Sequence, residues 1–258
     1  MSIIQGSSIS ASSTESGGFY DYPIEQSLRF DGSSYLSRPF GSGGSTTTWT
    51  YSSWVKRSTL SSSLGEALLF AGTVPSNDVY IYLSGTTDTL QYFDRGTGSN
   101  VVSSSQFRDV SAWYHFVVSL NTSTAESIKF YINGSLVTDF STSNYSTSPQ
   151  TINTAVAHRI GNRYYTTNDM HFNGYMANIQ FIDGQALDAS YFGEISQDIW
   201  VPKTFDGTSS TGGSTVSTDY GTNGFLLDFS SISGTTINDT APIDTNHSSA
   251  NNWTATGF

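Results

Sequence analysis

The residues best suited to catalysis in this chain are its carboxylates, and their spacing argues against a glycan hydrolase. Such an enzyme needs two carboxylates about 5–5.5 Å apart to retain the anomeric configuration, or farther apart to invert it. Side chains at positions i and i+2 of a strand share a face, so a catalytic pair on a strand would be closely spaced. No glutamate lies two or four residues from another acid in a strand-like segment; the five are Glu15, Glu25, Glu66, Glu126 and Glu194. Because no Gly-x-Ser-x-Gly run is present either, we expect no enzymatic activity.

The histidines form no metal-binding pattern in the sequence. His115 lies between Tyr114 and Phe116, inside a strand-like run, where a structural role is favoured over a ligand role. His158 and His171 bracket the segment 162–169 and could meet in space. Two histidines without a third ligand are weak grounds for zinc, which prefers four ligands in structural sites.

One loop combines the groups that sugars need. Aromatic rings stack on the C–H faces of a sugar, while charged and amide side chains hydrogen-bond its hydroxyls. Paired tyrosines on a loop equally suit a protein interface, where tyrosine is enriched. The sequence leaves the two alternatives open for these residues: Arg163, Tyr164, Tyr165, Asn168 and Asp169.

The elements that must position such a loop are β-strands. Phe116, Val118 and Leu120 alternate with smaller or polar residues, and residues 128–132 repeat the alternation, as in half-buried strands. Asn133-Gly134 follows, the dipeptide preferred in a type I′ turn because both positions need positive φ. We expect a two-sheet antiparallel β-sandwich with these side chains buried between the sheets: Trp54, Trp113, Phe130, Ile132, Ile179 and Phe181.

Composition excludes several partners. Only 12% of the 258 residues are charged and the net charge is −11, so both nucleic acid and anionic membrane surfaces are disfavoured. The chain has no cysteine, and its folding therefore relies on the core alone. No run of 18 apolar residues and no N-terminal signal pattern is present, so we expect neither a membrane span nor secretion.

Three segments are expected along the chain. Residues 1–25 form a Ser-rich N-terminal arm in which Phe19, Tyr20 and Tyr22 are candidate attachment residues. The arm would lie either in another subunit's groove or on its own domain. Residues 26–205 form the sandwich. Residues 206–258 contribute a loop, one strand and an irregular C-terminal tail packed on the sandwich or on a neighbour.

Five segments in order give the chain a family resemblance: 27–36, 48–56, 113–137, 160–182 and 183–195. Together they resemble laminin G-like domains of the concanavalin A-like lectin and glucanase jelly rolls. The resemblance implies a jelly-roll fold, and it identifies Trp54 as the buried tryptophan of its strand. Many such domains bind Ca²⁺ at one rim, which makes Asp169 a candidate ligand; a plain turn role is favoured, since Asp and Asn suit turns.

A narrower resemblance covers nearly the whole chain. The runs WVKR, FRDVSAWYH, FIDGQAL, YGTNGFLLDF and NNWTATGF are similar to laminin G-like proteins of marine tailed bacteriophages. This implies a virion surface protein, either a capsid decoration or a fibre, made in the host cytoplasm. It would contact other virion proteins, form a homo-oligomer and bind glycans through its jelly roll. The alternative is a receptor-binding lectin module of a tail fibre, and a glycan hydrolase is less favoured.

Overall fold

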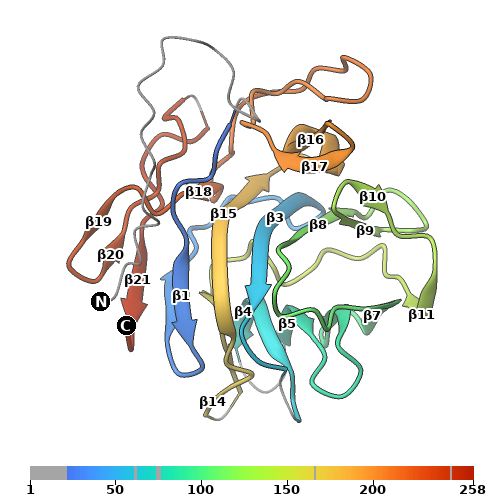
Figure 1. Cartoon of the computed structure of the whole chain (residues 1–258), viewed down its shortest axis with the longest axis vertical. Helices are drawn as coiled ribbons and strands as arrows, with labels where there is room; N and C mark the ends of the chain where they lie inside the picture. Colours follow the sequence, from blue (N-terminus) through green and yellow to red (C-terminus); the bar gives the residue numbers. More distant parts are fainter. Residues whose placement is uncertain (1–21, 61–62, 74–76, 166, 245) are drawn as a thin grey trace.

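The protein is a β-sandwich made of two antiparallel sheets (Figure 1). The computed structural model describes residues 22–60, 63–73, 77–165, 167–244 and 246–258. The only helix among these residues is one turn of 3-10 helix, η1 (Ala189–Tyr191). The expected all-β jelly-roll class is confirmed. Phe19 and Tyr20, two of the expected attachment residues, lie outside the described residues.

The first sheet has seven strands within the described part of the chain. The strand order is β1-β15-β3-β8-β9-β10. β18 also pairs with β15, along residues 179–181, whereas β1 pairs with residues 173–176 of β15. Its strands are β1 (Leu28–Asp31), β3 (Thr48–Arg57), β8 (Tyr114–Asn121), β9 (Ile128–Ile132), β10 (Ser135–Leu136), β15 (Asn173–Asp183) and β18 (Phe225–Leu227).

The second sheet has ten strands among the described residues, in the order β11-β7-β6-β5-β4-β12-β2-β21-β20-β19. They are β2 (Tyr35–Pro39), β4 (Glu66–Thr73), β5 (Asn77–Leu83), β6 (Thr89–Asp94), β7 (Ser99–Gln106), β11 (Phe140–Asn144), β12 (Ala157–Ile160), β19 (Ile232–Ser233), β20 (Thr236–Ile237) and β21 (Trp253–Thr256). Two small hairpins stand apart, β13 (Arg163–Tyr164) with β14 (Asn168–Asp169), and β16 (Gly193–Ser196) with β17 (Ile199–Pro202).

The hairpin between β9 and β10 forms as its sequence predicts. Asn133 and Gly134 have φ values of 47° and 83°, the two positive angles that a type I′ turn requires. The returning strand is short: β10 ends at Leu136, and the chain crosses to the other sheet as β11.

The buried tryptophan of β3 is Trp49, and the expectation for Trp54 was wrong. Trp49 is fully buried in the main core, whereas Trp54 is half-buried on the outer face and stacks on His115 at 4.8 Å. The two positions differ by five residues, so the strand sends them to opposite faces. Trp113 was also expected in the core, but it precedes β8 and is 37% exposed. Phe130, Ile179 and Phe181 are buried as predicted, and Ile132 is half-buried against the core.

The C-terminal extension is part of the sandwich and is not an irregular tail. β21 lies between β2 and β20 in the ten-stranded sheet, and Trp253 is fully buried. Its ring lies 5.0 Å from the Phe225 ring of the seven-stranded sheet. Strands from both sides of the expected boundary at residue 205 therefore belong to the same two sheets. Apolar residues are sparse after residue 231, but two buried side chains, Ile237 and Trp253, are enough to anchor the last strands.

A buried arginine joins the two sheets at one end of the sandwich. Arg57 of β3 is fully buried, and its Nε donates to Glu66 of β4 at 2.7 Å. One of its terminal nitrogens donates to Asp88 at 2.8 Å and to the Phe107 carbonyl at 2.9 Å. Arg108 pairs with the second oxygen of Asp88 at 2.8 Å. These ion pairs hold the pKa of Asp88 below its usual value, although burial acts in the opposite direction.

A buried histidine fastens the C-terminal extension. His247 is fully buried, with Nε2 3.0 Å from a carboxylate oxygen of Asp239 and Nδ1 3.3 Å from the carbonyl of Gly221. Because both ring nitrogens face acceptors, the doubly protonated imidazolium is the form that fits. Burial lowers the pKa of His247, but the hydrogen bond to Asp239 and nearby negative charge outweigh it and raise this pKa.

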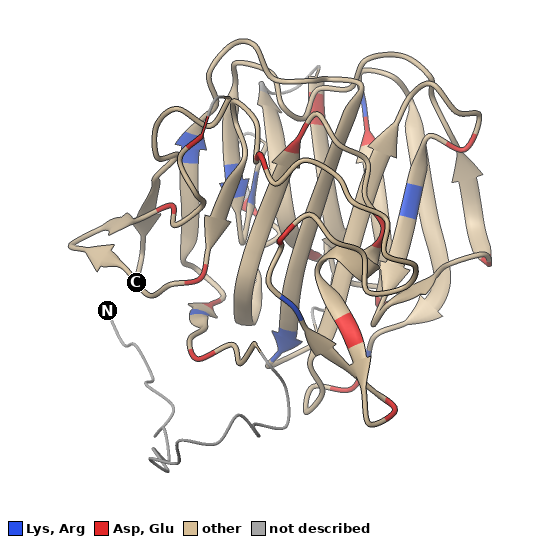
Figure 2. Cartoon of the chain, turned by 90° about the horizontal axis from the view of Figure 1, so that it is seen from above, with Lys and Arg blue, Asp and Glu red and all other residues tan. Residues whose placement is uncertain are grey.

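Positions of charged residues are few and scattered along the described part of the chain (Figure 2). Basic positions lie between acidic ones and form no continuous stripe, in agreement with the net charge of −11. Within the described residues, no helix has the length and apolar character needed to cross a membrane.

We predict that replacing Trp49 by alanine lowers the free energy of unfolding by about 3–5 kcal/mol, the range for large aromatics in cores. The matched Trp113→Ala change should cost less than about 1 kcal/mol, because the side chain is exposed. Urea unfolding of both variants measures the difference. Equal losses would contradict the assignment of Trp49 to the core.

We predict that His247 makes stability depend on pH. Its pKa in the folded protein lies above the unfolded value of 6.5, so its stabilisation is complete below about pH 6.5 and is lost as the pH rises through the folded pKa. The free-energy difference between wild type and His247→Gln should therefore be larger at about pH 5.5 than at about pH 8.5. The carboxylates of Asp239 and Asp244 also act on this ring. Chemical denaturation of Asp239→Asn at both pH values is therefore the control. If the free-energy difference between wild type and His247→Gln increased with pH, the raised pKa of His247 would be refuted.

Candidate functional site

The loop that carries the candidate sugar-binding residues folds back as a small hairpin. Arg163 pairs with Asp169 and Tyr164 with Asn168 across β13 and β14, and the backbone N–H of Tyr165 donates to the Thr167 carbonyl at 3.1 Å. The hairpin lies over the outer face of the ten-stranded sheet, since Arg163 reaches the Tyr80 hydroxyl of β5 at 3.3 Å. The structure thus brings together the loop residues that the sequence singled out.

A two-point ion pair sets the shape of the hairpin. Arg163 donates from Nε and from one terminal nitrogen to the two carboxylate oxygens of Asp169, at 2.9 and 2.8 Å. Hydrogen bonding to Asp169 raises the pKa of Arg163 above its usual value. Both oxygens of Asp169 are occupied by Arg163, which argues against the calcium role considered for this residue. Asp169 is not a turn residue either, because it lies in β14 and its carboxylate binds the Arg163 side chain.

Three arginines stack on aromatic rings around this hairpin. The Arg159 guanidinium lies 4.7 Å from the Tyr35 ring and 4.7 Å from the Tyr164 ring. Arg163 lies 5.1 Å from Tyr80 and 5.4 Å from Tyr165. Arg95 lies 5.6 Å from Phe93 and 5.7 Å from Tyr165. We call this set the aromatic–arginine surface: Tyr35, Tyr80, Phe93, Arg95, Arg159, Arg163, Tyr164 and Tyr165.

Stacking leaves one ring of this surface available to a ligand. Tyr164 is 43% exposed, and Arg159 contacts its ring. Tyr80 is nearly buried beneath the hairpin, and burial raises its pKa. The Arg159 guanidinium lies over the ring and holds it in place, so the exposed part of Tyr164 is a fixed flat group on which a ligand can stack.

The strand residues of this surface were not predicted from the sequence. Tyr80 and Phe93 pair across β5 and β6, and Arg159 pairs with Phe70 of β4, so their side chains share one sheet face. Each of them lies within an ordinary alternating strand pattern. The available signal was the Tyr80–Tyr82 spacing, which places two large polar aromatics on one face.

The histidines do not form a metal site. His115 is buried, with Nε2 2.9 Å from the Ser52 hydroxyl and Nδ1 accepting from the Trp200 indole at 3.0 Å, and burial lowers its pKa to about 3. His158 is buried and stacks on Phe40, whereas His171 is only half-buried. The described residues contain no group of three or more His, Cys, Asp or Glu side chains able to hold a metal ion.

The attachment residue that the structure does describe, Tyr22, packs on its own chain. It is half-buried and lies beside Asp228, which together with burial raises the pKa of Tyr22. Tyr22, Asn178 and Asp228 line a cavity of about 180 Å³. Of the two placements considered for the arm, this residue therefore adopts the one on its own domain.

Comparison with known proteins agrees with the fold. A family model described as the concanavalin A-like lectin/glucanases superfamily matches residues 30–190. Domain 4 of AbnA, a GH43 extracellular arabinanase from Geobacillus stearothermophilus solved in complex with arabinotriose, is similar with a TM-score of 0.50 and 20% identity, covering 66% of this chain and 76% of that chain. A protein from Bacteroides ovatus ATCC 8483, named provisionally as carbohydrate-binding, gives a TM-score of 0.53 and 18% identity over 90% of this chain and 58% of that chain. No curated protein matches the chain.

Proposed function

Because the chain belongs to the concanavalin A-like lectin/glucanases superfamily, we propose that it binds glycans without cleaving them, through the aromatic–arginine surface. The observation that carries the proposal is the exposed ring of Tyr164 stacked on Arg159. Sugars present an apolar C–H face, and the exposed part of the Tyr164 ring is a complement to it.

The rigidity of the surface supports the same proposal. The bidentate Arg163–Asp169 pair fixes β13, so Tyr164 is held in place before a ligand arrives. Preorganisation of this kind reduces the entropy lost on binding. The relative solved with arabinotriose makes pentose polymers a reasonable first class of ligand to test.

The carboxylates support binding without hydrolysis. Glu66 is buried and paired with Arg57, and Asp169 is paired with Arg163. Asp78 is buried and paired with Arg95. These three acids are thus engaged with arginines, whereas the buried Asp94, between Phe93 and Arg95, accepts from the backbone N–H groups of Thr97 and Thr151. A general acid would need a carboxyl group that can hold and release a proton beside the scissile bond.

We predict that Tyr164→Ala weakens binding to a responsive polysaccharide at least tenfold, which is about 1.4 kcal/mol. Tyr164→Phe should retain binding, because it keeps the stacking face. Tyr175→Ala is the matched control: Tyr175 is a half-buried tyrosine on the other sheet with Arg29 at 5.3 Å from its ring. Calorimetry and depletion assays on arabinan, xylan, β-glucan, agarose and alginate measure the effect. Wild-type affinity in Tyr164→Ala, or release of reducing sugar, would overturn the proposal.

We further propose that the module serves on a virion surface, as a capsid decoration or fibre, and that the N-terminal arm attaches it. The support is the resemblance of segments such as FRDVSAWYH and NNWTATGF to tailed-phage proteins, together with the low charge content. The alternative within this proposal is a receptor-binding module of a tail fibre. Other virion proteins and further copies of the chain would be its partners.

We predict that deleting residues 1–21 leaves the sandwich folded and removes its incorporation into particles or its self-association. Tyr22 stays in this variant because it packs on the sandwich. Light scattering of the purified protein and particle reconstitution are the measurements, with the melting temperature as the control for folding. Normal occupancy of particles by the truncated protein would place attachment elsewhere.

A further inference from the structure

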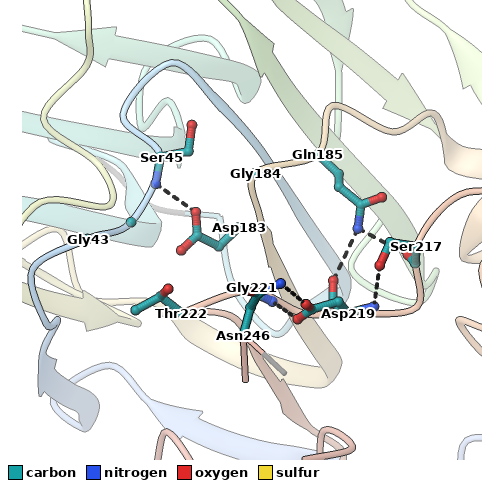
Figure 3. Close-up of a pocket in the computed structure, with 11 residues that line it drawn as sticks. Gly43, Ser45, Asp183, Gly184, Gln185, Ser217, Asp219, Gly221, Thr222 and Asn246 are labelled. Atoms are coloured by element: carbon teal, nitrogen blue, oxygen red, sulfur yellow. Dashed lines mark hydrogen bonds between the residues drawn. The ribbon is translucent and has the colours of Figure 1, made fainter. Parts of the chain in front are cut away.

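A polar pocket opens at the end of the sandwich that lies away from the β13–β14 hairpin. Its volume is about 370 Å³, and it lies where β15 ends, next to the loop between β2 and β3 and the segment 217–222 (Figure 3). The β13–β14 hairpin lies beyond the opposite end of β15 (Figure 1). With about 3.3 Å per residue, the 11-residue strand separates the two places by about 33 Å. The pocket is therefore distinct from the aromatic–arginine surface.

A buried carboxylate builds the pocket. One oxygen of Asp183 accepts from the backbone N–H of Ser45 at 2.8 Å and from the Asn153 amide at 2.6 Å, and the other accepts from the backbone N–H of Asn223 at 3.1 Å. Burial raises the pKa of Asp183, and these hydrogen bonds act against that rise. Three separate segments of chain are thus fixed to the end of β15, so the pocket is formed without a ligand.

A second carboxylate lies at the wall formed by residues 217–222. Asp219 accepts from the backbone N–H of Gly221 at 2.7 Å and contacts the Asn246 amide. The Gln185 amide donates to the carbonyls of Ser217 and Asp219, both at 3.1 Å, and so closes this wall (Figure 3).

Glycines line part of the pocket and leave its backbone uncovered. A Cβ atom added at Gly184 would meet nothing within 4 Å, and one added at Gly43 would meet only the Thr222 methyl, at 3.9 Å. Both glycines have positive φ values, 90° and 99°, which other residues rarely adopt. At these two positions the backbone therefore borders open space and is accessible to a ligand.

The chemistry of the described lining residues narrows the ligand class. They include two carboxylates, four amide or hydroxyl side chains besides Gln185, and four glycines, but no Lys, Arg or His and no aromatic ring. An anionic sugar would meet uncompensated repulsion from Asp183 and Asp219. A flat aromatic ligand would find nothing to stack on. A ligand rich in hydroxyl donors matches the carboxylate and carbonyl acceptors.

We infer that this pocket binds one residue of a neutral glycan through its hydroxyl groups. The inference goes beyond the proposed function, because it assigns a second and chemically different contact to the same module. The aromatic–arginine surface would stack on one part of a polymer, and the pocket, which shares no lining residue with that surface, would hold a single sugar residue elsewhere on it.

The test is an NMR titration of the labelled full chain with neutral monosaccharides: glucose, galactose, mannose and arabinose. We expect at least one of them to shift the backbone amide signals of Gly43, Gly184 and Gly221. Thr222→Tyr places a ring at the exposed mouth of the pocket and should weaken that binding at least tenfold. The matched control is Thr235→Tyr, at an exposed position that does not line the pocket.

A second variant guards against a folding defect. Asp219→Asn keeps an acceptor for the backbone N–H of Gly221 and removes the charge. This variant should therefore fold and still bind the sugar more weakly. Unchanged binding in both Thr222→Tyr and Asp219→Asn would overturn the inference. So would the absence of shifts with all four sugars, or shifts produced by Ca²⁺ alone and removed by a chelator, which would identify a cation site. Tyr164→Ala should leave these shifts intact, so failure here and failure of the proposed function are distinguishable.

Discussion

The charged cluster around Arg57 is the interaction on which the rest of the structure depends. It connects β3 of one sheet to β4 of the other through Glu66, and to the loop before β6 through Asp88. A buried guanidinium without partners would be very costly, so the two sheets can approach only in the register that completes the cluster. The apolar core supplies most of the stabilisation, but it is non-directional. The ion pairs give the packing of the two sheets a specific alignment.

The same cluster reaches the hairpin that carries the candidate surface. The second carboxylate oxygen of Glu66 accepts from the backbone N–H of Asn173 at 3.2 Å, where β15 begins. The next residue of β4, Ala67, donates to the carbonyl of Met170, one residue after β14. The position of Tyr164 therefore follows from a buried charge network on the other side of the sheet. A change in this network would be expected to move the hairpin before it unfolds the sandwich.

Few charged residues are available to this chain, and it uses most of its arginines as structural parts. Arg57 is buried between the sheets, while Arg95 and Arg163 each combine an ion pair with stacking on aromatic rings. Arginine suits this task because its planar group can stack and donate in its own plane at once. The outer face of the ten-stranded sheet is thus rigid and aromatic without being strongly charged. Such a surface fits a ligand that is neutral overall.

The sequence by itself determined the strands around residues 114–132, the Asn133-Gly134 turn and the sandwich class, because alternation and turn chemistry are local properties. It also singled out the loop at residues 163–169 by its residue types, although it did not predict that this loop folds as a hairpin. It did not predict the C-terminal strands β19–β21. It could not decide which tryptophan of β3 faces the core, since Trp49 and Trp54 both fit the strand and only sheet packing selects a face. Nor could it show that Tyr35, Tyr80 and Arg159 join the hairpin, or that Asp183 and Asp219 share a pocket. Those groups come from strands and loops far apart in the chain, and only the pairing of the sheets brings them together.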